Sequence, residues 1–307
     1  MGSVVVVGHT GQDGSYLVEQ LAERGSNYIG IGRAGPVDIS NPAAVADFVR
    51  HEQPAEIYYL AAHHQSSQDA VENDDDAISR GFMVHVRGLL SFLAAIAQHS
   101  PATRLFYAAS ARVFGDPQTA PQTETTPLAP ICAYGITKAS GIETCRLYRR
   151  KHRVFCSVGI LYNHESPRRS PSFVSRKISQ AVAAIKLGHR ETLVLGDLSA
   201  VVDWGAAADY VDAMQRILAS NSPDDFVVAS GRRSTVREFA EMAFAVVGLD
   251  YRHHVQEDCS VIRKTSRRTH LVGDSSKLRA ATGWAPATTL EDLARDMVLA
   301  DLAAATH

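Results

Sequence analysis

The stretch that most constrains the fold is VVVVGHTGQDGSYL at residues 4–17. Its four valines predict a short buried strand, and the glycines that follow, Gly8, Gly11 and Gly14, are spaced G-x-x-G-x-x-G. Glycines permit a tight turn and a close backbone approach, and the residues after them predict a helix. A strand, a glycine turn and a helix in this order are the first unit of a doubly wound α/β sheet.

The alternation of strands and helices continues through the first half of the chain. Apolar, β-branched runs predict parallel strands at 3–8, 27–32, 56–61, 104–109 and 154–160, with a late strand at 226–230. Helical periodicity predicts helices at 15–24, 42–51, 82–99 and 134–151, and later near 172–187, 206–219, 235–248 and 287–304. The fold class expected is therefore α/β, with a doubly wound parallel Rossmann sheet.

We expect two lobes. Residues 1–160, plus roughly 200–232, would form the Rossmann domain that binds a dinucleotide, and residues 161–199 and 233–307 would form a smaller substrate-binding lobe. A cleft between them would lie at the carboxyl ends of the strands, where open α/β sheets bind ligands.

Composition excludes several functional classes. A net charge of −2 gives no basic field for nucleic acid or anionic membrane, and the longest early apolar run is far too short to span a bilayer. The four cysteines lack C-x-x-C spacing, and the histidine pair His63–His64 lacks the i, i+4 spacing of helical metal ligands. We expect a cytoplasmic enzyme or binding protein with no metal, no nucleic-acid partner and no membrane partner.

The glycine turn indicates where a cofactor would bind. A helix N-terminus after such a turn attracts a pyrophosphate, although a purely structural turn is the alternative. Arg33 follows the second strand where an acidic residue would hold a ribose 2′-hydroxyl, so the sequence favours NADP over NAD unless Arg33 is simply exposed. Asp38 is either an adenine contact or part of a helix cap.

The stretch YGITK places Tyr134 and Lys138 on one helix face. A nearby ammonium, helped by a cationic nicotinamide, is expected to lower the tyrosine pKa from about 10, and Ser110 at the end of the preceding strand could bind the same substrate hydroxyl. These groups suit removal of a hydroxyl proton while hydride passes to the nicotinamide. The Y-x-x-x-K pattern is common on protein surfaces, but its place after a dinucleotide fold and a strand-end serine indicates function.

The chain resembles the extended short-chain dehydrogenase/reductases that act on nucleotide sugars, and more narrowly the GDP-mannose 4,6-dehydratase family. The resemblance rests on TGQDGSYL (10–17), PQTETTPLAP (121–130), ILYNHESPRR (160–169), FVSRKI (173–178), GDLSAVVDWG (196–205), STVREF (234–239) and GDSSKLRAATGWAP (273–286). These motifs span nearly the whole chain.

The resemblance implies roles for individual residues. Those expected to hold NADP are Gly8, Gly11, Gln12, Asp13, Gly14, Arg33, Asp38, Leu60, Ala61, Ala62, Tyr134 and Lys138. Ser110, Tyr134 and Lys138 would handle the C4 hydroxyl of the sugar, with Arg112 beside them. The residues expected at the substrate are His63, His64, Asn163, Arg169, Arg176, Lys177 and Arg263 or Lys264, and Glu165 would order the loop. A GDP-sugar is the substrate implied.

Arg112 departs from the family pattern. Where the dehydratases read Thr-Ser-Glu-Leu-Tyr-Gly, this chain reads SARVFG, so Arg112 replaces the glutamate that removes the C5 proton. A guanidinium stays protonated and cannot act as that base, which favours a 4-keto-sugar reductase or 4-epimerase. The alternative is an atypical dehydratase with another base, for which His63, His64 and Cys132 are possibilities, although the sequence favours polar lining and a small buried side chain for them. Arg112 would orient the sugar or a diphosphate oxygen, or pair with Glu124.

Other departures also bear on the activity. Val202 replaces the family's diphosphate-binding arginine, and the connection at 34–37 is short, as in the related reductases and epimerases. SARVFG also resembles the SATVYG of sugar 4-epimerases, whereas NHESPRR belongs to the dehydratases. A catalytically silent NADP-binding sensor or scaffold is a further alternative, and the intact Tyr134 and Lys138 speak against it. Relatives pair through the helices at 82–99 and 134–151, so we expect a homodimer.

Overall fold

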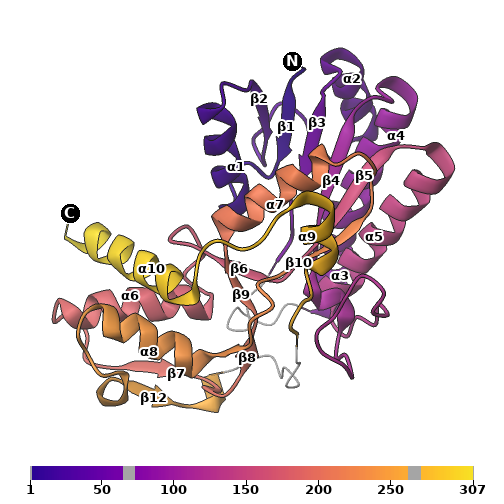
Figure 1. Cartoon of the computed structure of the whole chain (residues 1–307). Coiled ribbons are helices and arrows are strands. Elements are labelled where there is room, and N and C mark those ends of the chain that lie inside the picture. The colour runs from indigo at the N-terminus through magenta and orange to yellow at the C-terminus, as the bar shows by residue number, and fades with distance from the viewer. Residues whose placement is uncertain (1, 65–72, 262–270, 307) are drawn as a thin grey trace.

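The computed structural model describes residues 2–64, 73–261 and 271–306. Its centre is a parallel six-stranded sheet in the order β10-β5-β4-β3-β1-β2 (Figure 1). The strands are β1 (Val4–Val7), β2 (Tyr28–Ile31), β3 (Glu56–Tyr59), β4 (Arg104–Ser110), β5 (Phe155–Leu161) and β10 (Asp225–Val228). Each corresponds to a run predicted from the sequence, so the doubly wound α/β fold is confirmed.

Side chains that alternate along the strands build two cores, one on each face of the sheet. On one face, Val5 and Val7 pack with residues of α2 (Pro42–Glu52), α4 (Leu89–His99) and α5 (Ala133–His152). On the other face, Val4 and Val6 pack with residues of α1 (Gln12–Glu23), α7 (Ala207–Ala219) and α9 (Ser276–Thr282). This period of two is the expected consequence of a pleated strand that is buried on both sides.

The helix predicted at 82–99 is longer and less regular than its periodicity indicated. It begins with α3 (Asp74–Gly81), whose N-terminus is capped by the Asn73 side chain, passes through the π-helical turn η1 (Phe82–Gly88) and continues as α4. The first turn of α3 is polar, so the hydrophobic periodicity of the sequence did not predict this helix. Judged by length and composition alone, Asp74–His99 could span a membrane, and half of its most apolar window is buried within the fold.

A second group of elements packs around its own core. Helices α6 (Val174–Lys186), α8 (Val236–Val246) and α10 (Leu290–Ala305) bury Ile178, Phe239 and Met297 against one another. Three short strand pairs accompany them: β6 (Asn163–Glu165) with β9 (Trp204–Ala206), β7 (Leu193–Leu195) with β12 (Val255–Glu257), and β8 (Val201–Val202) with β11 (Ser234–Thr235). The later helices predicted from the sequence are present, whereas strands of two or three residues were too short to show a pattern. The exact division of the chain into two lobes stays a prediction.

Candidate active site

The fold brings Ser110, Tyr134 and Lys138 together at the carboxyl end of β4. Ser110 is the last residue of β4, and Tyr134 lies in the first turn of α5, where the two side chains hydrogen-bond. The Lys138 ammonium lies 5.7 Å from the Tyr134 ring centroid and donates a 2.6 Å hydrogen bond to the carbonyl oxygen of Ala108. The three residues proposed to handle a hydroxyl proton therefore share one site.

The electrostatics of Tyr134 differ from the expectation. Burial raises the pKa of Tyr134, and the carboxylate of Asp13 raises it further, so the protein by itself does not favour the phenolate. Two groups lower this pKa: the charge of Arg169 contributes most, and the hydrogen bond from the Ser110 hydroxyl contributes less. The expected lowering by the Lys138 ammonium is wrong for the protein alone, because desolvation of the phenol outweighs the nearby cations.

Lys138 is itself perturbed by its surroundings. Its side chain is 1% exposed, and this burial lowers its pKa to about 7, against a smaller opposing effect of Asp13. An ammonium with such a pKa can lose its proton near neutrality. Lys138 is therefore able to pass a proton as well as to carry a charge.

Aromatic rings enclose the phenol of Tyr134. The His64 ring lies edge-on with its centroid 4.7 Å from that of Tyr134, and the His85 ring lies 5.4 Å away and nearly perpendicular. Phe173 packs 5.2 Å from His64 and carries the Arg169 guanidinium 3.6 Å above its own ring. His64, predicted at the substrate from its place after β3, thus lies beside Tyr134.

Sequence analysis missed His85, which is fully buried in the π-helical turn η1. Its Nε2 accepts the backbone N–H of His63 at 2.9 Å, so its Nδ1 carries the hydrogen and donates it to the Thr137 hydroxyl at 2.8 Å. Burial and the charge of Lys138 lower the pKa of His85 to about 2. A lone histidine in an apolar helix gave no signal of this role, although π-helical turns often mark functional sites.

Arg112 lies in the short helix η2 (Ala111–Phe114) that follows β4. Its backbone N–H donates to the Ser110 hydroxyl at 3.3 Å, and its side chain is exposed. Glu124 accepts the backbone N–H of Val227 at 2.8 Å instead, and no acidic side chain of the described residues pairs with Arg112. The alternative that Arg112 pairs with Glu124 is therefore wrong.

The glycine turn has the shape that a dinucleotide requires. Gly8 has a φ of +95°, and a Cβ there would lie 2.9 Å from the backbone nitrogen of Ala61, while a Cβ on Gly14 would lie 2.3 Å from the carbonyl oxygen of Gly8. Gly11 caps α1 without a side-chain hydrogen bond, so the helix N-terminus is open to an anionic ligand. These features fit a bound pyrophosphate. The segment Leu60–Ala62, predicted at the cofactor, leaves β3 beside this turn, where Leu60 donates its N–H to Val7 at 2.9 Å.

Of the two residues predicted at the adenosine end of the cofactor, Arg33 is exposed and Asp38 is hydrogen-bonded within the protein. Arg33 is exposed shortly after β2, and its contact with a 2′-phosphate stays a prediction. Asp38 accepts the N–H and the hydroxyl of Ser40 at 2.9 and 2.7 Å, which lowers the pKa of Asp38, and Asn41 is the residue that caps α2. Asp38 therefore stabilises a local turn.

The loop between β6 and α6 is fastened to α1. Gln12 donates to the carbonyl oxygen of His164 at 3.0 Å and accepts the Ser166 hydroxyl at 2.9 Å. Arg168 binds the Glu19 carboxylate at 2.6 and 2.7 Å, and its guanidinium lies 4.0 Å from the Tyr16 ring centroid. The loop that carries the substrate residues is thus held on the helix that carries the glycine turn.

Within this loop, Glu165 orders its neighbours as expected. It is buried, accepts the Ser175 hydroxyl at 2.7 Å, and lies 3.1 Å from Nε of Arg169 in an ionic contact that lacks hydrogen-bond alignment. Asn163 is exposed on β6. The charge of Arg169 also reaches Tyr134 and Asp13, whose pKa values it lowers.

The remaining predicted substrate residues are not gathered at Tyr134. Arg176 forms an ion pair with the buried Asp301 of α10, so its guanidinium joins α6 to α10. Lys177 is partly buried on α6, and this burial, with the nearby charge of Arg190, lowers its pKa. Arg263 and Lys264 lie outside the described residues. Cys132 is exposed and caps α5, where its sulfur accepts the N–H of Gly135 at 3.4 Å.

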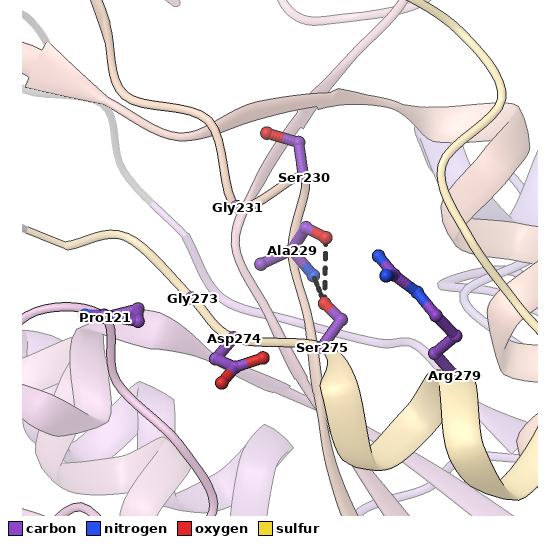
Figure 2. A pocket seen from close by; sticks show the side chains of 8 residues that line it. All are labelled: Pro121, Ala229, Ser230, Gly231, Gly273, Asp274, Ser275 and Arg279. Carbon is purple, nitrogen blue, oxygen red and sulfur yellow. Dashed lines mark hydrogen bonds between the residues drawn. The ribbon is translucent and has the colours of Figure 1, made fainter.

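A separate hollow of about 190 Å³ lies beyond the end of β10 (Figure 2). Its walls include Ser230, Ser275 and Arg279, and the Ser275 hydroxyl bonds both backbone groups of Ala229, at 3.0 and 2.8 Å. None of the predicted site residues lines it. Within the described ranges, no group of three or more histidine, cysteine or acidic side chains is placed to hold a metal ion.

Comparison with known proteins agrees with this architecture. The model of the family GDP-mannose 4,6 dehydratase matches residues 35–297. GDP-mannose 4,6 dehydratase 2 of Caenorhabditis elegans is 35% identical, covering 97% of this chain and 88% of the relative, and GDP-mannose 4,6 dehydratase 1 of Arabidopsis thaliana is 34% identical over 97% and 89%.

A solved structure shares the fold at lower sequence identity. The structure of RMD from Pseudomonas aeruginosa complexed with NADPH superimposes with a TM-score of 0.85, covering 99% of this chain and 100% of that chain at 21% identity. The resemblance inferred from the motifs is confirmed. The chain belongs to the GDP-mannose 4,6-dehydratase family of nucleotide-sugar enzymes.

Proposed function

We propose that this protein is an NADP-dependent enzyme that exchanges hydride at C4 of a nucleotide-diphosphate sugar, and that it acts as a 4-keto-sugar reductase or 4-epimerase. The sugar carrier proposed is GDP, since the relatives are named for GDP-mannose. The glycine turn and the open N-terminus of α1 support a dinucleotide, and the exposed Arg33 supports a 2′-phosphate.

The chemistry follows from the residues at the end of β4. NADP, when bound, exchanges a hydride with the sugar carbon. Tyr134 exchanges the proton of the C4 oxygen, and Ser110 holds that oxygen by the hydroxyl that now bonds Tyr134. Lys138, with its pKa near 7, completes a path by which the proton leaves or enters, and the rings of His64 and His85 exclude water from the phenol.

The exposed guanidinium of Arg112 is the observation that favours a reductase or epimerase over a dehydratase. The turn after Ser110 presents a guanidinium without an acidic partner among the described residues, so it offers charge to the substrate and no base to its carbon atoms. A reductase or an epimerase needs no carbon base at this turn. In this assignment Arg112 binds a sugar or diphosphate oxygen.

A second candidate is a dehydratase that uses a different base. Its support is the imidazole of His64, whose centroid lies 4.7 Å from that of Tyr134. An imidazole ring packed against the Tyr134 ring is a group of the right chemistry to accept a proton from a carbon of a sugar bound there. This candidate predicts that His64→Gln abolishes loss of water while leaving hydride exchange at C4.

We also propose that the enzyme is a cytoplasmic homodimer. Exposed apolar side chains gather on η1 and α5, namely Phe82, Met83, Ile136 and Leu147. A second copy would cover this face. Light scattering should give twice the chain mass, and Met83→Glu with Leu147→Glu should give the monomer.

The test of the proposed activity is NADPH consumption with a GDP-4-keto-hexose. The wild type should oxidise NADPH and Tyr134→Phe should not, although it still binds NADPH. If the wild type binds NADPH but neither reduces 4-keto sugars nor changes any nucleotide sugar, the protein is a silent NADP-binding sensor and the proposal is wrong.

A further inference from the structure

His164 on β6 lies between a backbone carbonyl oxygen and a carboxyl group, and the carboxyl group only accepts hydrogen bonds when it is ionised. Its Nδ1 lies 2.7 Å from the backbone carbonyl oxygen of Tyr162, and its Nε2 lies 2.9 Å from both carboxylate oxygens of Asp13. A neutral imidazole has one N–H and can satisfy one of these partners, whereas an imidazolium satisfies both. With Asp13 ionised, as its lowered pKa favours, only a protonated His164 satisfies both partners.

The location of Asp13 gives this pair a consequence for the cofactor. Asp13 is in the first turn of α1, the end of the helix whose N–H groups and dipole attract an anion. A carboxylate there repels a pyrophosphate unless a cation neutralises it. The side chains of His164 and Asp13 are only 12% and 19% exposed, so salt screens the pair weakly.

Other charged groups also face the pair. Arg169 lowers the pKa of both partners, and the charge of Asp13 reaches Lys138 and Tyr134. The Gln12 amide donates to Asp13 at 3.2 Å, and the Tyr210 ring stacks on His164 with centroids 4.6 Å apart. Arg169 is already engaged with Glu165, so His164 is the cation in direct contact with Asp13.

The titration of both groups agrees with the geometry. Burial by itself would raise the pKa of Asp13 and lower that of His164, but their mutual attraction outweighs it, so the pKa of Asp13 is lowered and that of His164 is raised. A raised histidine pKa means that the charge is fully present below the ordinary value and disappears only as the pH rises through the raised value. The pair is thus fully charged below the ordinary histidine pKa of about 6.5, and it is lost as the pH rises through the raised value.

We propose that His164 is a positioning residue for the cofactor: its imidazolium neutralises Asp13 and ties the glycine turn to β6, so that the anionic dinucleotide binds tightly only while His164 is protonated. This rests on the proposed function only in taking NADP(H) as the ligand. His164 does not touch the reacting atoms in this account. It acts through Asp13.

The test is the affinity for NADPH, followed by its fluorescence, at neutral and alkaline pH. His164→Gln should weaken binding about tenfold or more at neutral pH, because an uncompensated charge remains at the anion site. Asp13→Asn, which keeps the shape and a hydrogen-bonding group, should restore the affinity of His164→Gln. Lys138 also titrates near neutrality, so the pH dependence that belongs to His164 is the part that the double variant loses.

The control is His254→Gln. His254 also stacks on an aromatic ring, Phe244, and its Nδ1 also faces a carbonyl oxygen, at 3.0 Å, but no carboxylate in the described part of the chain pairs with it. This variant should bind NADPH as the wild type does. A second measurement, which does not depend on the variants folding, is the NMR titration of His164 in the cofactor-free protein, where its pKa should exceed the ordinary value.

The outcomes separate the two proposals. A protein that binds no NADPH contradicts the proposed function. A protein that binds NADPH, but whose His164→Gln variant has wild-type affinity, or is weakened without rescue by Asp13→Asn, contradicts the role of His164. A His164 that titrates at or below the ordinary value contradicts it as well.

Discussion

Two segments lie on either side of Tyr134, the proposed catalytic tyrosine, and they are built in opposite ways. The loop from β6 to α6 is fastened to α1 by Gln12, Ser166 and Arg168, and most of its charged groups have partners. The turn η2, by contrast, presents the single exposed cation Arg112 with no acidic partner among the described residues. The difference teaches that the loop after β6 is held in place by contacts within the protein, whereas the turn that we propose decides the chemistry leaves its cation exposed.

Tyr134 lies between the two segments, and its replacement should have the largest effect. Tyr134→Phe removes the proton-exchanging hydroxyl, so turnover with a GDP-4-keto-hexose should fall by about 10²–10⁴-fold. NADPH binding should survive, measured by fluorescence. Tyr148→Phe on the same helix is the matched control and should keep full activity, and an active Tyr134→Phe would remove the tyrosine from the mechanism.

Arg176 lies on α6, directly after the loop that is fastened to α1, and it has a buried ionic partner. Its ion pair with the buried Asp301 predicts that Arg176→Gln costs about 3 kcal/mol of unfolding free energy, because a buried carboxylate loses its partner. Denaturant unfolding measures this, and Arg216→Gln, which breaks an exposed pair on α7, should cost far less. A stable Arg176→Gln with a greatly raised KM for the nucleotide sugar would instead support the substrate contact predicted from the sequence.

The buried imidazole of His85 should make the free energy of unfolding depend on pH. Its pKa is lowered from 6.5 to about 2, so below pH 6.5 the unfolded chain takes up a proton that the folded protein refuses. Stability should therefore fall with acid by up to about 1.4 kcal/mol per pH unit from this group, a loss that continues toward pH 2. His85→Gln should have a shallower acid dependence of the unfolding free energy, and an unchanged slope would mean that His85 is protonated in the fold.

Replacement of Arg112 should have the smallest effect on activity, and this effect should be confined to binding of the nucleotide sugar. If its guanidinium binds the substrate, Arg112→Ala should raise the KM for the nucleotide sugar about tenfold and change kcat little. Arg150→Ala, which removes an exposed arginine near the end of α5, is the control. A variant that loses kcat but keeps its KM would make Arg112 part of the chemistry.

The sequence was sufficient to predict the sheet and the grouping of Ser110, Tyr134 and Lys138. Short β-branched runs, the glycine turn and the four-residue spacing of Tyr134 and Lys138 are local signals, and each was confirmed as structure. The helix α3 was not predicted because its first turn is polar. The short strands were not predicted because two or three residues are too few to show an alternating pattern.

Contacts between distant residues could not be predicted. Asp13 and His164 are 151 positions apart, and only the fold brings the first turn of α1 against β6. Arg176 was assigned to the substrate from its motif, but the pairing with Asp301 depends on how α10 packs on α6. The pKa of Tyr134 was misjudged because spacing reveals the neighbouring ammonium but not the burial of the phenol.

The measurement that tests the central claim most directly is mass spectrometry of GDP-mannose after incubation with the purified protein and NADP. With Arg112 in the turn after Ser110, we expect no product lighter by one water. A product that has lost one water would contradict the assignment as a reductase or epimerase, and would make His64 the first residue to replace.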